Sequence, residues 1–253
     1  MQYQEARAIG PGHLQRTSDD LQSILRRETE DYLRSLIIDD YPKRQQLFWK
    51  RDYSCLEGFL KSVEPNRERW QNCLGVFQPE GEFEAEEEPF LKDEHVRAFW
   101  VSLRFARNLR CRAILALPQK RKTTKLPLVI AQHGIGSNPE RVMGFLDEPN
   151  YYHAYGYRLA KDGFAVVAPQ HLTGIERRRY QRLALLLGAT LAGLEVCKLK
   201  RLLDYLVGRP EVDGDRIGMW GISLGGYYTL LTLPVEPRIK LGICCAFFNH
   251  RLE

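Results

Sequence analysis

The sequence lacks the features that would place the protein in a membrane or outside the cell. No apolar run approaches the length needed to cross a bilayer, and the N-terminal stretch MQYQEARAIGPGHLQR has no apolar core of the kind that secretory signals carry. The six cysteines, at positions 55, 73, 111, 197, 244 and 245, form no C-x-x-C pair and no framework spacing. We therefore predict buried free thiols in a reducing compartment, and a cytoplasmic protein that does not bind membranes.

A strong charge and a dinucleotide-binding motif are missing as well. The net charge is only +5 over 253 residues, and the basic clusters at 120–122 and 177–179 are short. Nucleic-acid binding needs a basic stripe, so solvated loop or helix faces explain these clusters better. No predicted strand is followed by G-x-G-x-x-G, which argues against dinucleotide binding. We expect no nucleic-acid partner.

The first third of the chain differs from the rest in composition and in the spacing of its apolar residues. Polar residues with Gly-Pro-Gly fill the first 17 positions, and apolar residues at helical spacing follow. A further helix is predicted from Pro65 to Gly75, so residues 1–79 are expected to form a helical extension. Glutamates dominate the stretch EGEFEAEEEP, which predicts an acidic linker over 80–94, with an interaction tail as the alternative.

From residue 95 to 253, short apolar segments alternate with helical ones. The stretches VRAFWVSLRF and RCRAILALP are typical of two strands, arranged as a hairpin. Four later runs are short and nearly all apolar, as parallel strands buried on both faces are: LPLVIAQHG, GFAVVAPQH, RIGMWG and IKLGICCAFF. The clearest helix between them is predicted at about 189–207. This alternation predicts an α/β fold with a mostly parallel sheet.

A serine between glycines stands where a predicted strand ends and a predicted helix begins. The order Gly221-Ile222-Ser223-Leu224-Gly225 is a G-x-S-x-G motif, and Gly226 follows it. A sharp strand–helix corner brings the two elements so close that side chains two before and two after the serine would collide. Glycine avoids this collision, and the corner lifts the hydroxyl of Ser223 above the sheet. The amide of Leu224 is then a candidate donor to an oxyanion.

A second candidate for oxyanion binding follows an earlier strand. His133-Gly134-Ile135-Gly136 comes directly after the apolar run that begins at residue 126. The amide of Ile135 is the first candidate donor, and that of Gly134 or Gly136 the fallback. The alternative is an ordinary turn, in which Ser137 and Glu140 form a helix capping box; both descriptions can hold for the same loop.

Residues 95–250 resemble the α/β-hydrolase superfamily, in the branch of dienelactone hydrolases, acetyl-xylan-type esterases and bacterial carboxylesterases with helical N-terminal extensions. Four stretches carry the resemblance: LPLVIAQHGIGSNPE, YGYRLAKDGFAVVAPQ, RPEVDGDRIGMWGISLGGYYTLL and EPRIKLGICCAFFNH. It implies a twisted sheet flanked by helices and a serine esterase that acts on small-molecule carboxylic esters through an acyl-enzyme on Ser223. It implies no metal and no organic cofactor. It also implies that His133 positions the oxyanion loop and that His171 lines the pocket.

The acid and the base of a catalytic triad are harder to find. In the family order an acid and then a histidine follow the serine, but beyond Ser223 the chain offers only Glu236, Glu253 and His250. His250 is the candidate base, because it comes at the carboxyl end of a predicted strand; a strand end that frays into solvent is the alternative.

Two hypotheses therefore remain open at this point. The chain is either an active serine esterase or a C-terminally incomplete hydrolase fold, without its last strands and triad, that folds or binds without turnover. The second hypothesis predicts an open, apolar sheet edge at 239–248 and self-association through that edge.

Overall fold

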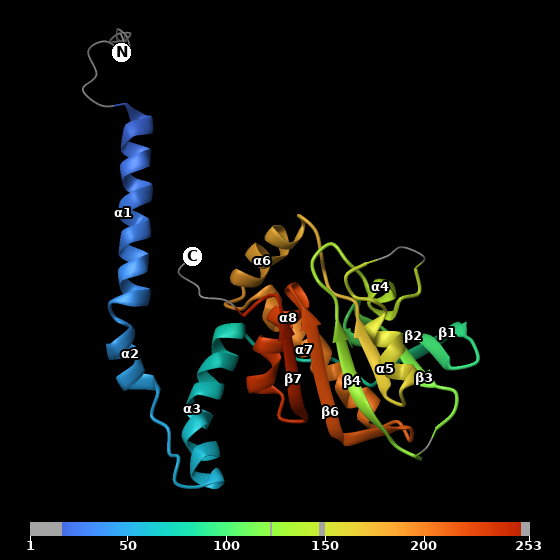
Figure 1. Cartoon of the computed structure of the whole chain (residues 1–253). Coiled ribbons are helices and arrows are strands. Elements are labelled where there is room, and N and C mark those ends of the chain that lie inside the picture. The colour runs from blue at the N-terminus through green and yellow to red at the C-terminus, as the bar shows by residue number, and fades with distance from the viewer. Residues whose placement is uncertain (1–16, 122, 147–149, 249–253) are drawn as a thin grey trace, which may run out of the picture. The chain divides into compact units, whose positions relative to one another are not determined.

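The computed structural model describes residues 17–121, 123–146 and 150–248 (Figure 1). The candidate base His250 lies outside the described residues. Contacts divide the chain into two compact units, one of residues 64–250 and the other of residues 1–63 with 251–253. The division falls within helix α3 (Leu56–Leu74), inside the predicted helical extension.

The first unit consists of helices α1 (Ser18–Ile38) and α2 (Tyr41–Phe48) and the beginning of α3. Thr17 caps α1: its hydroxyl accepts from the Asp20 amide at 3.2 Å, and the Asp20 carboxylate accepts from the Thr17 amide at 2.9 Å. Helix α3 begins at Leu56 and contains Pro65, so the helix start predicted at that proline is wrong. Proline suits a first helical position, but apolar residues at helical spacing extend α3 upstream of it.

The second unit is built on a seven-stranded sheet of order β1-β2-β3-β5-β4-β6-β7. Strands β2 (Val96–Ala106) and β3 (Leu109–Pro118) form the predicted hairpin, and β3 is antiparallel to β5 (Ala165–Pro169). Strands β5, β4 (Leu126–Gln132), β6 (Val212–Ile222) and β7 (Ile239–Cys245) run parallel to one another. Their carboxyl ends therefore meet at one edge of the sheet, the edge at which ligands bind in such folds.

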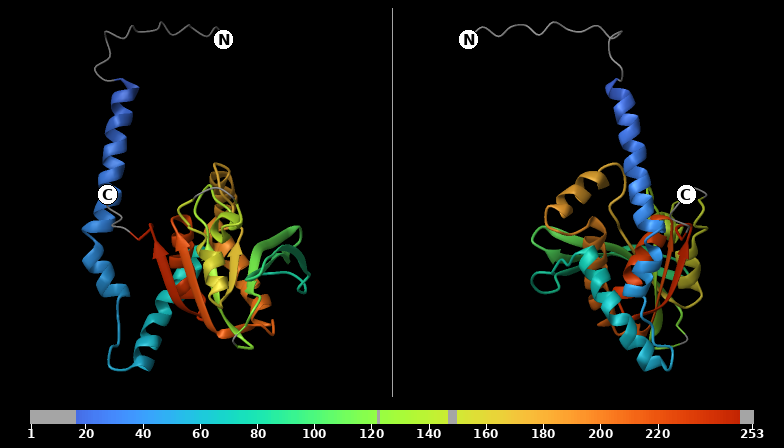
Figure 2. Two further views of the ribbon diagram at one scale, coloured as in Figure 1. Left: turned by 45° about the vertical axis from the view of Figure 1, so that its right-hand side comes forward. Right: turned by 90° about the vertical axis from the view of Figure 1, so that its left-hand side faces the viewer.

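Helices cover both faces of this sheet, as the continuous apolar strands predict (Figures 1 and 2). Helices α4 (Pro139–Met143) and α5 (Tyr155–Lys161) pack on one face against Ile114, Ala116 and Val166. Helices α7 (Leu191–Val207) and α8 (Leu224–Thr232) pack on the other face, against Leu115, Leu128 and Ile130. The short helix α6 (Arg177–Leu185) precedes α7, and a 3-10 turn (Leu233–Val235) follows α8. The α/β architecture predicted for this part of the chain is confirmed.

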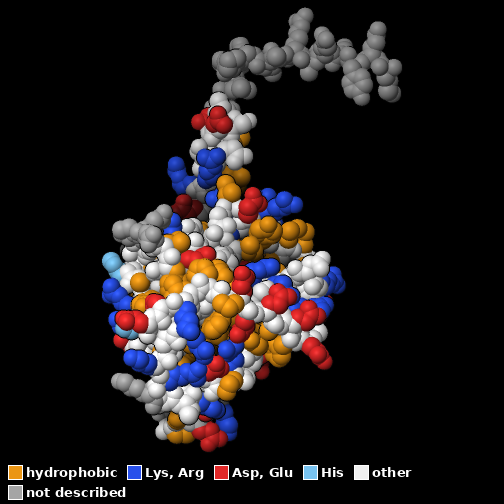
Figure 3. Space-filling model, turned by 90° about the vertical axis from the view of Figure 1, so that its right-hand side faces the viewer, with side chains coloured by type: hydrophobic (Ala, Val, Ile, Leu, Met, Phe, Trp, Pro, Cys, Tyr) orange, Lys and Arg blue, Asp and Glu red, His pale blue; other side chains and the backbone are white. Residues whose placement is uncertain are grey.

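The acidic stretch is a correction to the sequence analysis, because Ala85–Lys92 forms the edge strand β1 and pairs with β2. Arginines in or near the neighbouring elements bind its glutamates: Arg104 pairs with Glu84, Arg110 with Glu86 at 3.2 Å, and Arg209, which follows α7, with Glu87. The face in Figure 3 shows acidic and basic side chains interspersed in this way. Charged, exposed side chains also protect an edge strand from pairing with other chains.

Among the described residues, no helix is long and apolar enough to span a bilayer.

A close backbone contact holds the end of α3 against the start of α7. The Leu74 carbonyl accepts from the Thr190 amide at 3.0 Å and from the Thr190 hydroxyl at 2.7 Å. A Cβ at Gly193 would lie 2.1 Å from this same carbonyl oxygen, so only glycine allows the approach.

Replacing Gly193 by alanine is expected to lower the free energy of unfolding by about 1–3 kcal/mol, because α3 must move away from α7. Gly208→Ala, at the other end of α7, is the matched control, since a Cβ there has 3.4 Å of clearance. Urea unfolding followed by circular dichroism measures both variants. Equal stability of the two variants would contradict the prediction.

Candidate active site

Ser223 occupies a sharp corner between a strand and a helix. Strand β6 ends at Ile222 and α8 begins at Leu224, so the serine alone makes the turn. Its backbone has φ 57° and ψ −116°, a conformation that costs a residue with a side chain on the order of 1–3 kcal/mol. The Ser223 amide donates to the Cys245 carbonyl at 2.9 Å, which ties the corner to the end of β7.

The glycines around Ser223 lie where backbones nearly touch. A Cβ at Gly221 would be 2.1 Å from the Gly225 carbonyl oxygen, and one at Gly225 would be 2.6 Å from the carbonyl oxygen of Gln132. A Cβ at Gly226 would be 2.7 Å from the Cys245 carbonyl oxygen. The first turn of α8 therefore packs directly against the ends of β4 and β7, and no larger residue fits these positions.

The loop after β4 lies beside the serine. A Cβ at Gly134 would be 3.5 Å from the Cβ of Ser223, so the loop and the corner are in contact. The Gly134 amide donates to the Tyr152 hydroxyl oxygen at 2.6 Å and is therefore occupied. Gly136 has φ 70°, the left-handed region that favours glycine, and ends the tight turn. This geometry brings Gly134 into contact with the Ser223 corner, and Ile135 and Gly136 follow it in the same turn.

Two backbone amides at this corner have no hydrogen-bond acceptor within the described part of the chain. One belongs to Leu224, the first residue of α8, and the other to Ile135, whose side chain is 55% exposed. A helix leaves its first amides unpaired and carries a partial positive charge at its N-terminus, so negative charge is favoured there. Leu224, which follows Ser223, and Ile135, in the loop that contacts the corner, thus leave two donors free.

His133 is buried and both of its ring nitrogens are engaged. Nδ1 lies 2.9 Å from the Gly134 carbonyl oxygen, and Nε2 accepts from the His171 amide at 3.0 Å. Since Nε2 accepts, the proton is on Nδ1 and is donated to Gly134. Burial, with the neighbouring His171, lowers the pKa of His133 to about 3, so the ring is neutral at physiological pH. His133 therefore holds the Gly134–Ile135 peptide rather than taking a proton from Ser223.

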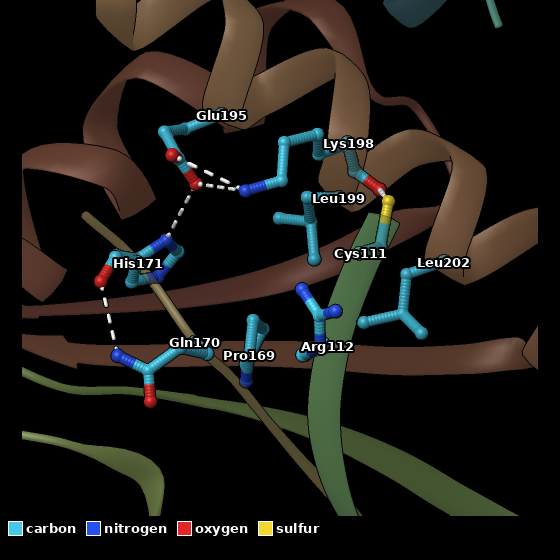
Figure 4. Close-up of a pocket in the computed structure, with 9 residues that line it drawn as sticks. All are labelled: Cys111, Arg112, Pro169, Gln170, His171, Glu195, Lys198, Leu199 and Leu202. Carbon is cyan, nitrogen blue, oxygen red and sulfur yellow. Dashed lines mark hydrogen bonds and ion pairs between the residues drawn. The ribbon is translucent and has the colours of Figure 1, made fainter. Parts of the chain in front are cut away.

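His171 follows β5 and is buried, and it borders a small cavity together with Glu195 and Lys198 (Figure 4). Its Nδ1 lies 3.2 Å from Glu195 Oε2, and its Nε2 lies against Oε1 of Gln132. Its ring packs on Tyr228 with a centroid distance of 4.5 Å. Lys198, one turn along α7, donates to Glu195 at 3.1 Å (Figure 4). Of these groups, only His171 stood out in the sequence.

The general base is the component that the described residues do not supply. Ser223 has no side-chain hydrogen-bond partner among them, and neither His95 nor His153 contacts it. The proposed base, His250, falls outside the described residues. Within the described ranges no cluster of three or more histidine, cysteine or acidic side chains is arranged to hold a metal ion.

Sequence reasoning missed Gln132, Tyr152, Glu195 and Lys198. Tyr152 lies in the aromatic run YYHAYGY, which indicates packing; burial raises the pKa of its hydroxyl to about 12, so it stays protonated. Glu195 and Lys198 lie in a leucine-rich helix, where a charged pair three residues apart usually faces solvent. The one available signal was that both fall near the apolar stripe of that helix.

No known protein-family profile matches the chain. The Bacillus subtilis protein named "Putative hydrolase YtaP" is 29% identical over 135 residues, which are 50% of this chain and 45% of that protein. The chain therefore spans about half the length of the curated relative it matches.

Solved structures give the fold. A putative acetyl xylan esterase of Bacteroides fragilis matches 74% of this chain and 53% of its own, with a TM-score of 0.62 at 17% identity. Methylesterase BT1017 matches 75% of this chain and 42% of its own, with a TM-score of 0.56 at 20% identity. The acetyl xylan esterase of Paenibacillus sp. R4 covers 71% of this chain and 56% of its own, with a TM-score of 0.51 at 19% identity. The chain has the fold of the α/β-hydrolases.

Proposed function

We propose that this protein is a serine hydrolase that cleaves small-molecule carboxylic esters through an acyl-enzyme on Ser223. The observation that supports this most strongly is the strained corner at Ser223, with the unpaired amides of Leu224 and Ile135 beside it. Strain at a residue with a side chain persists only where the surrounding structure holds it, and it concentrates at functional sites. The fold shared with acetyl xylan esterases and a methylesterase is consistent with an ester substrate.

The reaction follows from the groups present. The Ser223 hydroxyl attacks the ester carbonyl while a base takes its proton, and a tetrahedral intermediate forms with its negative charge on the former carbonyl oxygen. The amides of Leu224 and Ile135 bind this oxyanion, and the α8 N-terminus favours its charge. Collapse expels the alcohol, and water then releases the acid by the same steps. We assign the base to His250, which follows β7 in the chain.

The surface next to the oxyanion site offers contacts for the substrate. Tyr151 is 61% exposed, and its hydroxyl lies 3.5 Å from that of Tyr152, which in turn contacts Gly134. Ile135 is also exposed. We propose that these two side chains contact the acyl group.

We also propose that the protein is cytoplasmic and that it pairs with a second copy of itself along β7. The cysteines are free in the described structure, which suits a reducing compartment, although Cys55 and Cys73 are exposed rather than buried as the sequence predicted. Strand β7 is the edge of the described sheet, and Leu241 and Ile243 on it are 62% and 39% exposed. An exposed apolar edge strand favours pairing with another strand.

The reactivity of Ser223 is tested by labelling the folded chain with a fluorophosphonate probe, read by intact mass and peptide mapping. We expect one adduct on Ser223, none in Ser223→Ala, and unchanged labelling in Ser102→Ala, which alters a serine on β2. In His250→Asn we expect labelling to slow by at least tenfold, because the serine loses its base. Absence of an adduct on the folded wild-type chain would support a hydrolase fold that does not turn over.

The oxyanion site is tested by removing one amide. Ile135→Pro deletes the N–H donor, and we expect kcat for a p-nitrophenyl ester to fall about 10²–10³-fold. Ile135→Ala keeps the donor and removes only an exposed side chain, so kcat is expected to stay within threefold. Similar losses in the two variants would show that the amide of Ile135 does not bind the oxyanion.

Self-association is tested by analytical ultracentrifugation. Leu241→Lys and Ile243→Lys are expected to convert a dimer to a monomer, because each places a charge on the exposed edge strand. Leu109→Lys, which charges an exposed position on β3, is the control and should leave the dimer intact. A wild-type chain that sediments as a monomer across micromolar concentrations would refute the proposal.

A further inference from the structure

The buried pair Glu195 and Lys198 is an unusual feature of α7. The Glu195 side chain is 2% exposed and that of Lys198 is 11% exposed, in a helix whose other inward side chains are mostly leucine and valine. Burial disfavours the Glu195 charge, but Lys198 and His171 hold the pKa of this carboxyl at about 2. Well-packed apolar residues usually stabilise a core as much as a buried ion pair does. The fold alone therefore does not require these charges.

Glu195 fixes the protonation and the orientation of His171. Burial lowers the pKa of His171, so the ring is neutral and carries one proton. The carboxylate can only accept, which places that proton on Nδ1, at 3.2 Å from Glu195 (Figure 4). Nε2 is then an acceptor. The structure places Gln132 Oε1 against it, so the side-chain amide must be turned by half a rotation to present its NH₂ group to Nε2. This orientation also gives the Gln132 amide nitrogen a partner that it otherwise lacks.

The backbone of His171 passes this restraint to His133. The His171 amide donates to His133 Nε2 at 3.0 Å, while the His171 ring contacts the side chain of Gln132, the residue before His133. The end of β5 is thus held to the end of β4 by two contacts. Glu195 anchors both contacts from α7, on the opposite side of His171.

His133 in turn sets the direction of the Ile135 amide. Its Nδ1–H donates to the Gly134 carbonyl at 2.9 Å, and the Ser137 amide donates to the same oxygen at 3.3 Å. The Gly134 C=O and the Ile135 N–H belong to one planar trans peptide and point in opposite directions. Holding the carbonyl toward His133 therefore holds the N–H on the opposite side of this peptide.

We propose that Glu195, acting through His171 and His133, is a positioning residue that aims the Ile135 amide at the oxyanion site. This inference rests on the proposed function of Ser223, which it deepens. Glu195 does not touch the substrate. It supplies a fixed buried acceptor for His171, and the contacts of His171 with Gln132, of His171 with His133 and of His133 with Gly134 depend on that acceptor. A small misplacement of an oxyanion donor lowers the rate without weakening the binding of the uncharged substrate.

Two double variants test the proposal. Glu195→Leu with Lys198→Met removes the acceptor and leaves no buried charge unpaired. Glu195→Gln with Lys198→Met has the same charge and nearly the same shape, but keeps a carbonyl oxygen that accepts from His171 Nδ1–H. We expect kcat for a p-nitrophenyl ester to fall at least tenfold in the leucine variant with KM within twofold. In the glutamine variant, kcat should stay within threefold of wild type.

A buried carboxylate outside the network serves as a control for loss of stability. Glu236 has a side chain that is 2% exposed and pairs with Arg238 at 2.6 Å, before the start of β7 and so at the opposite end of the sheet from Ser223. Glu236→Gln is expected to lower the melting temperature without changing kcat. Equal kcat in the leucine and glutamine double variants would overturn the proposal.

A second measurement keeps this inference separate from the proposed function. Nitrogen-15 NMR of the histidine rings should show protonated Nδ1 and bare Nε2 for both His133 and His171 in the wild type. The leucine double variant should lose the Nδ1–H signal of His171 to exchange and shift the signals of His133, while the glutamine variant should keep both. If the wild-type chain neither labels nor hydrolyses esters, the proposed function fails; unchanged His133 signals in the leucine variant would overturn the positioning role itself.

Discussion

The structure around Ser223 depends on one constraint, the direct contact between the first turn of α8 and the ends of its neighbouring strands. Side chains at Gly221, Gly225 or Gly226 would overlap carbonyl oxygens at 2.1 to 2.7 Å, so the helix approaches the sheet as closely as backbones permit. That approach leaves a single residue to make the turn and forces it to φ 57°. It also aims the unpaired amides of α8 along the sheet edge, where the loop after β4 lies. Strain, exposed donors and the neighbouring loop thus share one cause.

The ionic contacts of the second unit fall into two kinds with different consequences. Arginines on β2, on β3 and just after α7 hold the glutamates in and directly before β1 at the surface, where solvent weakens each pair to roughly 0–1 kcal/mol. Glu195 and Lys198 are buried, where removal of one partner alone costs about 3–5 kcal/mol. A charge in such a position tolerates only one arrangement of its neighbours. The buried pair therefore fixes the positions of side chains at the carboxyl ends of the parallel strands, and the surface pairs hold β1 at the edge of the sheet.

The sequence was sufficient for features whose cause is local. Continuous apolar runs predicted β4, β5, β6 and β7, and glycine spacing predicted where Ser223 and the loop after β4 lie. Strand β1 was missed because its partners, among them Arg104 and Arg209, lie far away in the chain, so its glutamates looked uncompensated. Tyr152 and Glu195 were missed for the same reason: their roles come from contacts with Gly134 and His171, which only the folded sheet brings together. The local sequence pattern predicts a helix or strand, whereas the role of its side chains depends on residues that are distant in the sequence.

The position of Ser223 also explains why the base is the remaining question. The serine, its helix and the loop after β4 come from neighbouring strands, so they assemble whenever the sheet does. A base has to come from another segment, and His133 and His171 are unsuitable because each uses both ring nitrogens within the loop network. An oxyanion site without its triad still accelerates ester cleavage by about 10³–10⁴ over water, whereas a complete triad adds about 10⁶. The two hypotheses for this chain therefore differ in their rate of ester cleavage by an amount that is easily measured. A slow reaction that survives loss of His250 would indicate that the oxyanion site, formed by the two amides, accelerates cleavage without a base.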